Sequence, residues 1–344
     1  MGKLSDKDYY QQRLSVRESA NAYARLRKNV LKQGILDRDY FYYSKLFVLV
    51  IIGLSLGLYF LIVSQSFVSI FVSGLFFTFF AMQITGIFHD AGHRAIFKST
   101  RNNDITGYFC CAILAYTYRK WRVNHNKHHA NPNEEEMDPD IERPMFSFNK
   151  KQLKAKKSLW YFLSKKQVFF YYPIGTLTGI YSQIANVIYF IRESEKTSFW
   201  EKAVYVAGII FWIFGPILTF GAAKAFIIYF TVYPLFGLYL FNVFAPNHKG
   251  MPQIKKGQKI SFLEQQLVTA RNIKGGFFTD IILLGLNYQI EHHLFPDCPR
   301  NKLKLLTVHV KALCRETGLE YTETNLIESN RIILRELDNV ASTS

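Results

Sequence analysis

Four uncharged, strongly apolar runs punctuate this chain, and each is about as long as a helix that crosses a lipid bilayer. The first two lie at residues 46–64 and 67–88, with a short polar turn between them. The second two lie at residues 203–223 and 225–247, with only Lys224 between them. A helix needs roughly 20 apolar residues to cross the hydrocarbon core. We therefore predict an all-α integral membrane protein with four transmembrane helices arranged in two hairpins.

A fifth uncharged run, at residues 168–191, is open to two interpretations. It is long enough to cross a membrane, but Pro173, Gln183 and Asn186 make it polar for a helix that faces lipid. A fifth crossing would also place everything after it on the opposite side. We interpret this run as one or two helices lying in the membrane interface, or as a re-entrant segment.

Charge supports this topology. The chain has 42 Lys and Arg against 26 Asp and Glu, a net charge of +16. All but Lys224 of these cations lie in residues 1–45, 89–202 and 248–344, and the positive-inside rule places such segments in the cytoplasm. A basic face on anionic lipid accounts for the charge, and we expect no nucleic-acid partner because no nucleic-acid motif accompanies it. The aromatic content of 16% excludes a disordered chain.

The polar segments are expected to form one helical cytoplasmic part that caps the two hairpins. Helices are predicted at residues 6–32 and 302–337, the latter with a turn near Gly318. We treat residues 1–344 as a single membrane domain. Because no fused electron-donor domain and no retention signal is seen, a bacterial inner membrane is the expected location.

Seven of the nine histidines fall in three short motifs. On a helix, residues i, i+3 and i+4 share one face, so each motif directs its imidazoles toward one place. Imidazole is a good ligand for iron, zinc and copper. With four spans, all three motifs and His248 lie on the same side of the membrane. The motif histidines are His89 and His93, then His125, His128 and His129, then His292 and His293, which follow Gln289.

Each motif has a simpler explanation when it is taken alone. His89 and His93 fit two hydrogen-bonded helix histidines, the second motif fits a solvated basic segment, and His248 fits a membrane-interface histidine. His309 stands apart and is interpreted as a surface residue. The four cysteines lack the spacing of an iron–sulfur site. The ordered combination of three motifs on one side favours a single metal site.

Together the motifs resemble those of the membrane-bound fatty acid desaturases, in the branch whose third motif begins with Gln. They read His-Asp-Ala-Gly-His at 89–93, His-Asn-Lys-His-His at 125–129, and Gln-Ile-Glu-His-His at 289–293. The resemblance implies an oxidoreductase that uses two iron ions, dioxygen and two electrons to introduce a carbon–carbon double bond into an acyl chain. Gln289 departs from the commonest form of the third motif and is a possible ligand or hydrogen-bonding neighbour of the ligands. Asp90, an acidic neighbour of His89, is a possible hydrogen-bonding neighbour for the same reason of proximity. The implied iron ligands are His89, His93, His125, His128, His129, His248, His292 and His293.

The resemblance also implies partners. The substrate would be a fatty acyl chain linked to CoA, a carrier protein or a phospholipid. Electrons would come from a ferredoxin or a small haem protein with its reductase, because the sequence has no His-Pro-Gly-Gly haem motif and no Gly-x-Gly-x-x-Gly fingerprint. A hydroxylase or ketolase on the same scaffold is the nearest alternative. A membrane metal carrier is an alternative of another class, disfavoured because no acidic residue lies within the spans.

Overall fold

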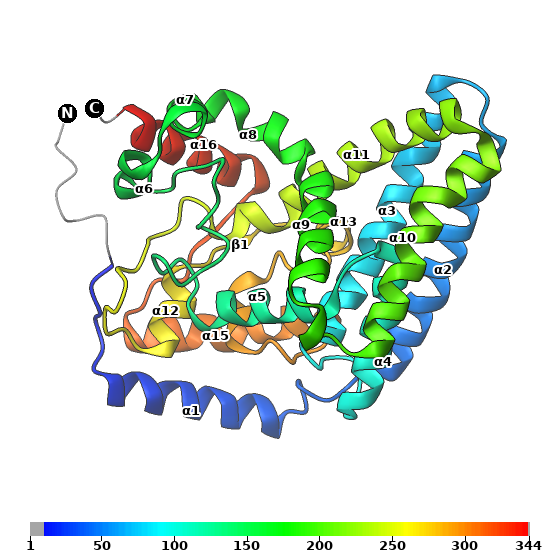
Figure 1. Ribbon diagram of the computed structural model, residues 1–344. Coiled ribbons are helices and arrows are strands. Elements are labelled where there is room, and N and C mark those ends of the chain that lie inside the picture. Colours follow the sequence, from blue (N-terminus) through cyan, green and yellow to red (C-terminus); the bar gives the residue numbers. More distant parts are fainter. Residues whose placement is uncertain (1–9, 343–344) are drawn as a thin grey trace. The chain divides into compact units, whose positions relative to one another are not determined.

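Helix dominates the computed structural model, which describes residues 10–342 (Figure 1). The chain divides into two compact units. Within the described residues, unit 1 draws on Met1–Asp37, Asn124–Tyr171 and Val243–Ser344, and unit 2 consists of Arg38–Val123 and Tyr172–Asn242.

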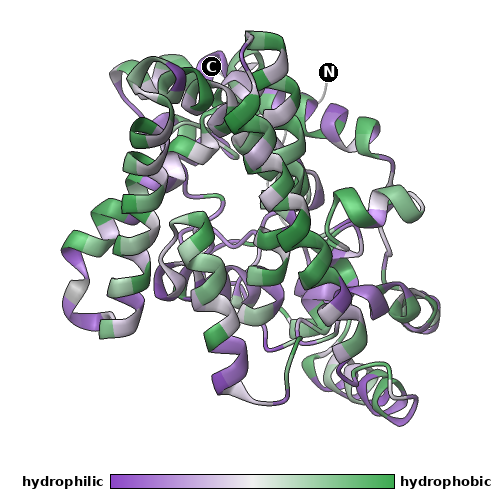
Figure 2. Cartoon of the chain, turned by 90° about the vertical axis from the view of Figure 1, so that its right-hand side faces the viewer, coloured by the Kyte–Doolittle hydropathy of each residue, from purple (hydrophilic) through white to green (hydrophobic). Residues whose placement is uncertain are grey.

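Unit 2 contains most of the apolar helices. Four helices are long and apolar enough to cross a membrane, as predicted: α2 (Tyr40–Val63), α3 (Phe67–Gly92), α10 (Phe199–Phe220) and α11 (Ala222–His248), of which α11 ends in unit 1. Figure 2 shows the hydrophobic residues running along them. α2 and α10 begin earlier than the apolar runs do. Their starts are set by Asp39 and Ser198, whose side chains accept hydrogen bonds from first-turn backbone N–H groups.

The ambiguous apolar run forms two helices, α8 (Gln167–Thr176) and α9 (Thr178–Arg192), which meet at an angle of 67°. Within unit 2, α9 lies very close to α11. A Cβ atom on Gly237 would lie 2.8 Å from the backbone nitrogen of Gly179, and one on Gly179 would lie 2.8 Å from the carbonyl oxygen of Tyr233. Small residues permit such close approach of membrane helices. The two glycines therefore fix the packing of α9 on α11.

Two further helices, α4 (Thr100–Leu114) and α5 (Tyr118–Ala130), carry the chain from the first pair of long helices to the second histidine motif. They are joined at Ala115, which has a left-handed conformation with φ of 51°. The buried Asn186 of α9 stabilises this joint, because its Oδ1 accepts hydrogen bonds from both the backbone N–H and the hydroxyl of Thr117.

The core of unit 1 lies where α1 (Val16–Lys32) packs on α12 (Phe262–Val268) and α15 (Leu303–Thr317). α1 begins at Ser15, whose capping box with Glu18 satisfies first-turn N–H groups. The predicted helix at 6–32 is thus too long at its start, and its residues 6–9 lie outside the described part. Apolar side chains from all three helices, including Val30, Leu267 and Leu306, form one core with those of α14 (Gln289–Leu294), such as Ile290.

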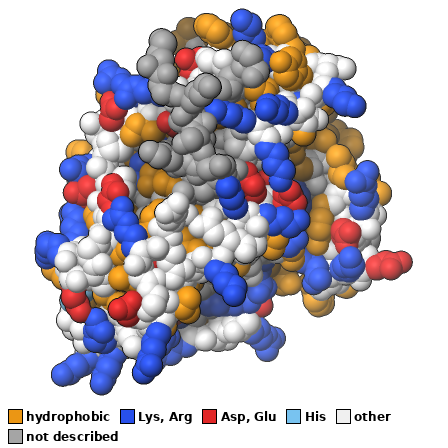
Figure 3. Space-filling model, turned by 90° about the vertical axis from the view of Figure 1, so that its left-hand side faces the viewer, with side chains coloured by type: hydrophobic (Ala, Val, Ile, Leu, Met, Phe, Trp, Pro, Cys, Tyr) orange, Lys and Arg blue, Asp and Glu red, His pale blue; other side chains and the backbone are white. Residues whose placement is uncertain are grey.

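The C-terminal part follows the prediction closely. α15 is followed by Gly318 at φ of 71°, and α16 (Leu326–Ser342) comes after it. The expectation of an all-α chain is wrong for one short element, a parallel pair of two-residue strands, β1 (Asn272–Ile273) and β2 (Glu323–Thr324). Viewed from the left of Figure 1, blue Lys and Arg side chains outnumber red acidic ones (Figure 3). The remaining short helices are α6 (Lys150–Ala155), α7 (Ser158–Lys165), η2 (Ser194–Lys196), α13 (Phe277–Ile282) and η3 (Arg300–Lys302).

Candidate metal centre

Unit 1 gathers six of the nine histidines from three helices. α5 contributes the second motif, α14 the third, and α11 ends at His248. Neighbouring residues on a helix point about 100° apart, so His128 and His129 diverge, as do His292 and His293. The result is two separate trios, in each of which the ring nitrogens lie within 4.8 Å of one another. We call them the 129 trio (His125, His129 and His292) and the 128 trio (His128, His248 and His293).

The 129 trio has the spacing of metal ligands. The Nε2 atom of His129 lies 3.1 Å from Nε2 of His125 and 3.2 Å from Nε2 of His292. Imidazole nitrogens bind a transition metal at about 2.1 Å, so two of them at right angles around one ion lie about 3.0 Å apart. The three nitrogens therefore fit adjacent corners of one coordination shell.

The 128 trio is more deeply buried and its rings pack against one another. The centroid of the His248 ring lies 4.6 Å from that of His128 and 4.6 Å from that of His293. All three side chains are at most 5% exposed. Three imidazoles gathered in one buried place, where none of them is exposed to water, form a donor set suited to a transition metal.

A polar contact at the other ring nitrogen, Nδ1, orients each imidazole of the 128 trio. Nδ1 of His128 lies 3.0 Å from both carboxylate oxygens of Asp138. Nδ1 of His248 donates to the Thr269 carbonyl oxygen at 2.9 Å, and Nδ1 of His293 donates to the Gln266 side-chain oxygen at 2.7 Å. A proton held on Nδ1 leaves the lone pair on Nε2. Every Nε2 of this trio is thereby prepared to bind a metal.

Gln266 is oriented by a second contact. Its amide nitrogen donates to the His129 carbonyl oxygen at 3.2 Å, which turns its oxygen toward His293. One side chain on α12 thus connects the helices that carry the second and third motifs. Gln266 and Thr269 were not predicted from the sequence, because neither belongs to a motif or has a recognisable spacing from one.

The pair formed by His128 and Asp138 is polarised. Burial opposes the charged form of both groups, but the Asp138 carboxylate still raises the pKa of His128 above its ordinary value. Their mutual attraction likewise keeps the pKa of Asp138 below its ordinary value despite burial. Asp138 also accepts hydrogen bonds from the backbone N–H groups of Asn133 and Asp140, each at 2.8 Å. It remains an anion that holds the imidazole from behind.

Gln289 lies beside the 128 trio. Its amide nitrogen is 2.9 Å from Nε2 of His248, and its amide oxygen accepts a hydrogen bond from the Asn247 side chain at 3.2 Å. The neighbouring Glu291 has a different environment, because its carboxylate accepts from Asn272 at 2.6 Å and from Tyr321 at 2.8 Å. Glu291 therefore anchors α14 to the strand pair and does not orient an imidazole.

The first motif lies in unit 2, at the end of α3. The rings of His89 and His93 pack edge to face, with centroids 4.7 Å apart. Asp90 accepts a hydrogen bond from the Tyr43 hydroxyl at 2.8 Å, and its other oxygen lies 3.5 Å from Nδ1 of His89. His309, on α15, belongs to neither trio among the described residues.

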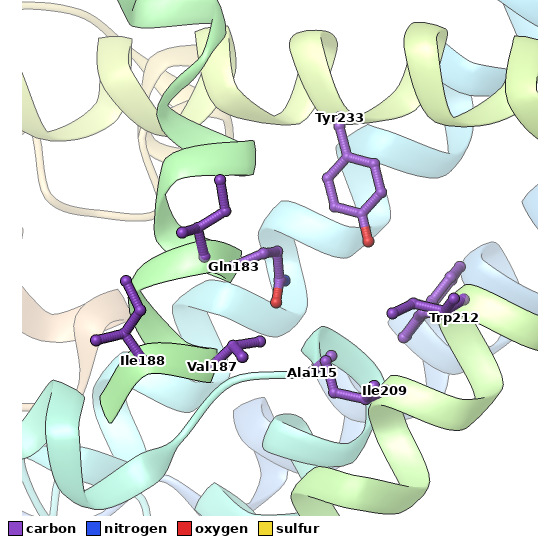
Figure 4. Close-up of a pocket in the computed structure, with 9 residues that line it drawn as sticks. Ala115, Gln183, Val187, Ile188, Ile209, Trp212 and Tyr233 are labelled. Carbon is purple, nitrogen blue, oxygen red and sulfur yellow. The ribbon is translucent and has the colours of Figure 1, made fainter. Parts of the chain in front are cut away.

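Unit 2 also contains an apolar cavity of about 300 Å³ (Figure 4). α9, α10 and α11 surround it, and Ala115 closes it where α4 and α5 join. Tyr233 and Gln183 contribute polar side-chain atoms to the lining, as Figure 4 shows. The amide nitrogen of Gln183 donates a hydrogen bond to the Leu114 carbonyl oxygen at 2.9 Å. The rest of the lining consists of Ile184, Val187, Ile188, Ile209, Trp212 and Ile213.

Long apolar helices together with two histidine trios that could hold a metal ion define a helical membrane protein with a candidate metal centre. The comparison with known families is more specific: residues 62–325 match the fatty acid desaturase family, and the chain belongs to it. It is similar to an acyl-lipid 8-desaturase of Rebecca salina, with 30% identity over 72% of this chain and 58% of that protein.

Two other relatives extend the comparison. A fatty acid desaturase 2-like protein of Mus musculus is 26% identical over 99% of this chain and 71% of its own length. An acyl-lipid (9-3)-desaturase of Physcomitrium patens is 28% identical over 74% of this chain and 50% of its own length. The chain thus spans between half and about seven tenths of these relatives.

Proposed function

We propose that this protein is an oxygen-dependent acyl desaturase, which introduces a carbon–carbon double bond into the acyl chain of a lipid. The observation that carries the proposal is the pair of histidine trios, whose nitrogens converge in a chain that belongs to the desaturase family. The names of the relatives support the reaction, since those compared above are acyl-lipid or fatty acid desaturases.

The two trios divide the proposed metal ligands between two iron ions. The 128 trio would hold one ion, with Gln289 beside it as a ligand or as a hydrogen-bonding neighbour of a bound water. The 129 trio would hold the other. His89 and His93 are further proposed ligands of the iron pair, as the resemblance to the desaturases implies. Asp90 would then orient His89. When bound, the iron pair supplies with dioxygen the strong oxidant that side chains alone lack.

The protein's own groups prepare this site. Asp138, Thr269 and Gln266 hold protons on Nδ1 so that Nε2 stays unprotonated. The apolar cavity of unit 2 would receive part of the acyl chain and exclude water from it. We further propose that the four spans form two hairpins, that unit 1 faces the cytoplasm as the basic charge suggests, and that a separate ferredoxin or small haem protein supplies electrons.

A product assay tests the proposed function. The protein is expressed in a host that lacks desaturases, and its lipids are profiled by mass spectrometry. We expect acyl chains lighter by two hydrogens, and none in cells that produce the His128→Ala variant. Acyl chains heavier by one oxygen would instead establish a hydroxylase. Exchangeable zinc without any lipid product would indicate a metal carrier.

A bulky substitution in the cavity tests its role in substrate binding. Ile209→Phe fills part of the space between α9 and α10, whereas Ile210→Phe makes the same change at an exposed position one residue later. We expect Ile209→Phe to lower the yield from the longest acyl chains roughly tenfold or more and to spare shorter ones, because a misfit in an apolar pocket is felt at each methylene. Ile210→Phe should keep the original profile. The same profile in both variants would contradict a role for the cavity.

A further inference from the structure

The helix α7 of unit 1 exposes an unusual amount of apolar surface. Four consecutive side chains, Leu159, Trp160, Tyr161 and Phe162, are each between 42 and 61% exposed. Successive residues point about 100° apart, so these four cover most of the helix circumference. A contiguous exposed patch of this kind indicates a surface that contacts another apolar phase or partner.

Polar contacts fix this helix in place, so its exposure is not that of a loose segment. The side chain of Lys156 donates to the hydroxyl of Ser164 at 3.0 Å. Lys165 donates to the Ala341 carbonyl oxygen at 2.8 Å, and Gln167 donates to that of Leu337, also at 2.8 Å. Both acceptors lie on α16, and Figure 1 shows α7 beside it. α16 thus holds α7 from one side and leaves its aromatic side chains uncovered.

Along the chain, the charges on both sides of α7 have one sign. Residues 144–171 contain seven lysines and no acidic residue. Lys154, Lys157 and Lys166 are exposed at the two ends of the aromatic run. Trp and Tyr favour the headgroup level of a bilayer, and lysines placed beside them extend toward phosphate groups.

We propose that α7 lies in the membrane interface and that Lys154, Lys157 and Lys166 bind the headgroups of anionic phospholipids. Clustered lysines beside an interfacial helix attract anionic lipid specifically. A second copy of this chain is a poor occupant, because it would bring a like-charged patch against the first. The proposal concerns lipid binding and does not depend on the proposed enzymatic reaction.

Lipid-dependent fluorescence quenching tests this proposal. The full chain is placed in phosphatidylcholine nanodiscs that contain phosphatidylglycerol, with the quenching bromines on one lipid or on the other. The signal of Trp160 is the difference between the protein and its Trp160→Phe variant. We expect brominated phosphatidylglycerol to quench Trp160 roughly twofold or more strongly than brominated phosphatidylcholine at equal mole fraction.

A matched pair of triple variants isolates the lysines. Lys154→Gln, Lys157→Gln and Lys166→Gln together should make the two brominated lipids equally effective. Lys28→Gln, Lys32→Gln and Lys304→Gln remove the same charge from exposed positions elsewhere and should preserve the preference. Equal quenching by both lipids in the unmodified chain would overturn the headgroup binding. Trp160 shielded from both lipids would overturn the interfacial placement and indicate a protein partner instead.

Discussion

A His128→Ala variant is expected to lose about half of the protein's bound iron and to show no desaturation above background. The change removes one nitrogen from the buried 128 trio and leaves its two neighbours, His248 and His293, with too few partners to retain an ion. It also leaves the Asp138 carboxylate buried beside an empty space, stabilised by the backbone N–H groups of Asn133 and Asp140 and by the positive charge of Lys249 but no longer by the imidazole. Both effects act on the 128 trio, while the 129 trio keeps all of its nitrogens.

Elemental analysis of the purified variant measures the iron, and lipid mass spectrometry measures the product. His309→Ala is the matched control, because this histidine belongs to neither trio among the described residues. It should retain both iron and activity. Membrane insertion of both variants should match that of the unmodified chain, because His128 lies outside the four long apolar helices. A His128→Ala protein with full iron and normal product would show that the 128 trio is not a metal site.

The sequence was sufficient for the long helices because their signal is local. An uncharged run of about 20 residues has few alternatives to a membrane helix. The residues at which the helices begin and end were harder to predict from the sequence. α2 begins at Tyr40, six residues before the apolar run, because Asp39 caps the first turn with its side chain. Such a cap acts through one hydrogen bond and leaves no mark on the hydrophobic pattern.

The histidine motifs showed a similar division between local and distant information. Spacing of i and i+4 correctly places His125 beside His129, but the expectation that each motif directs all of its imidazoles toward one place is wrong for His128 and His293. It does not reveal that His128 and His129 belong to different trios, since that depends on where α11 and α14 pack against α5. The partners Gln266 and Thr269 lie 27 and 21 residues from the histidines that they contact, His293 and His248, and belong to no motif, so only the folded chain brings them to the site.

Asn133→Asp is expected to weaken metal binding by about 10- to 100-fold, the usual effect of losing a group that supports the ligands. Asn133 connects the supports of two histidines. Its side-chain nitrogen donates to the carbonyl oxygens of His248 at 3.1 Å and Pro252 at 3.2 Å, with that of Thr269 at 3.5 Å. Its backbone N–H donates to Asp138, which holds His128. The side chain therefore ties the end of α11 to the loop that follows α5.

Aspartate has the same shape as asparagine but the wrong polarity for this place. Its carboxylate would face three carbonyl oxygens in a side chain that is only 2% exposed, with no hydrogen to donate. A buried group left without its hydrogen bonds costs about 1–3 kcal/mol, and more when it is charged. Asn133 also has a φ of 54°, a left-handed conformation that Asp tolerates nearly as well as Asn, so the backbone is not the cause of the expected effect.

Two further variants separate positioning from general instability. Asn131→Asp makes the same chemical change in the same loop, where the amide donates to the Lys127 carbonyl oxygen and to no metal-supporting group among the described residues, and should bind metal normally. Asn133→Gly keeps the left-handed backbone and adds no charge, so it should lose less stability than Asn133→Asp while still binding metal weakly. Cobalt(II) titration followed by visible absorption measures affinity and ligand geometry together, and thermal unfolding of the metal-free protein measures stability. If Asn133→Gly bound cobalt as tightly as the unmodified chain, with the same absorption bands, Asn133 would be a structural residue without a role in placing His248.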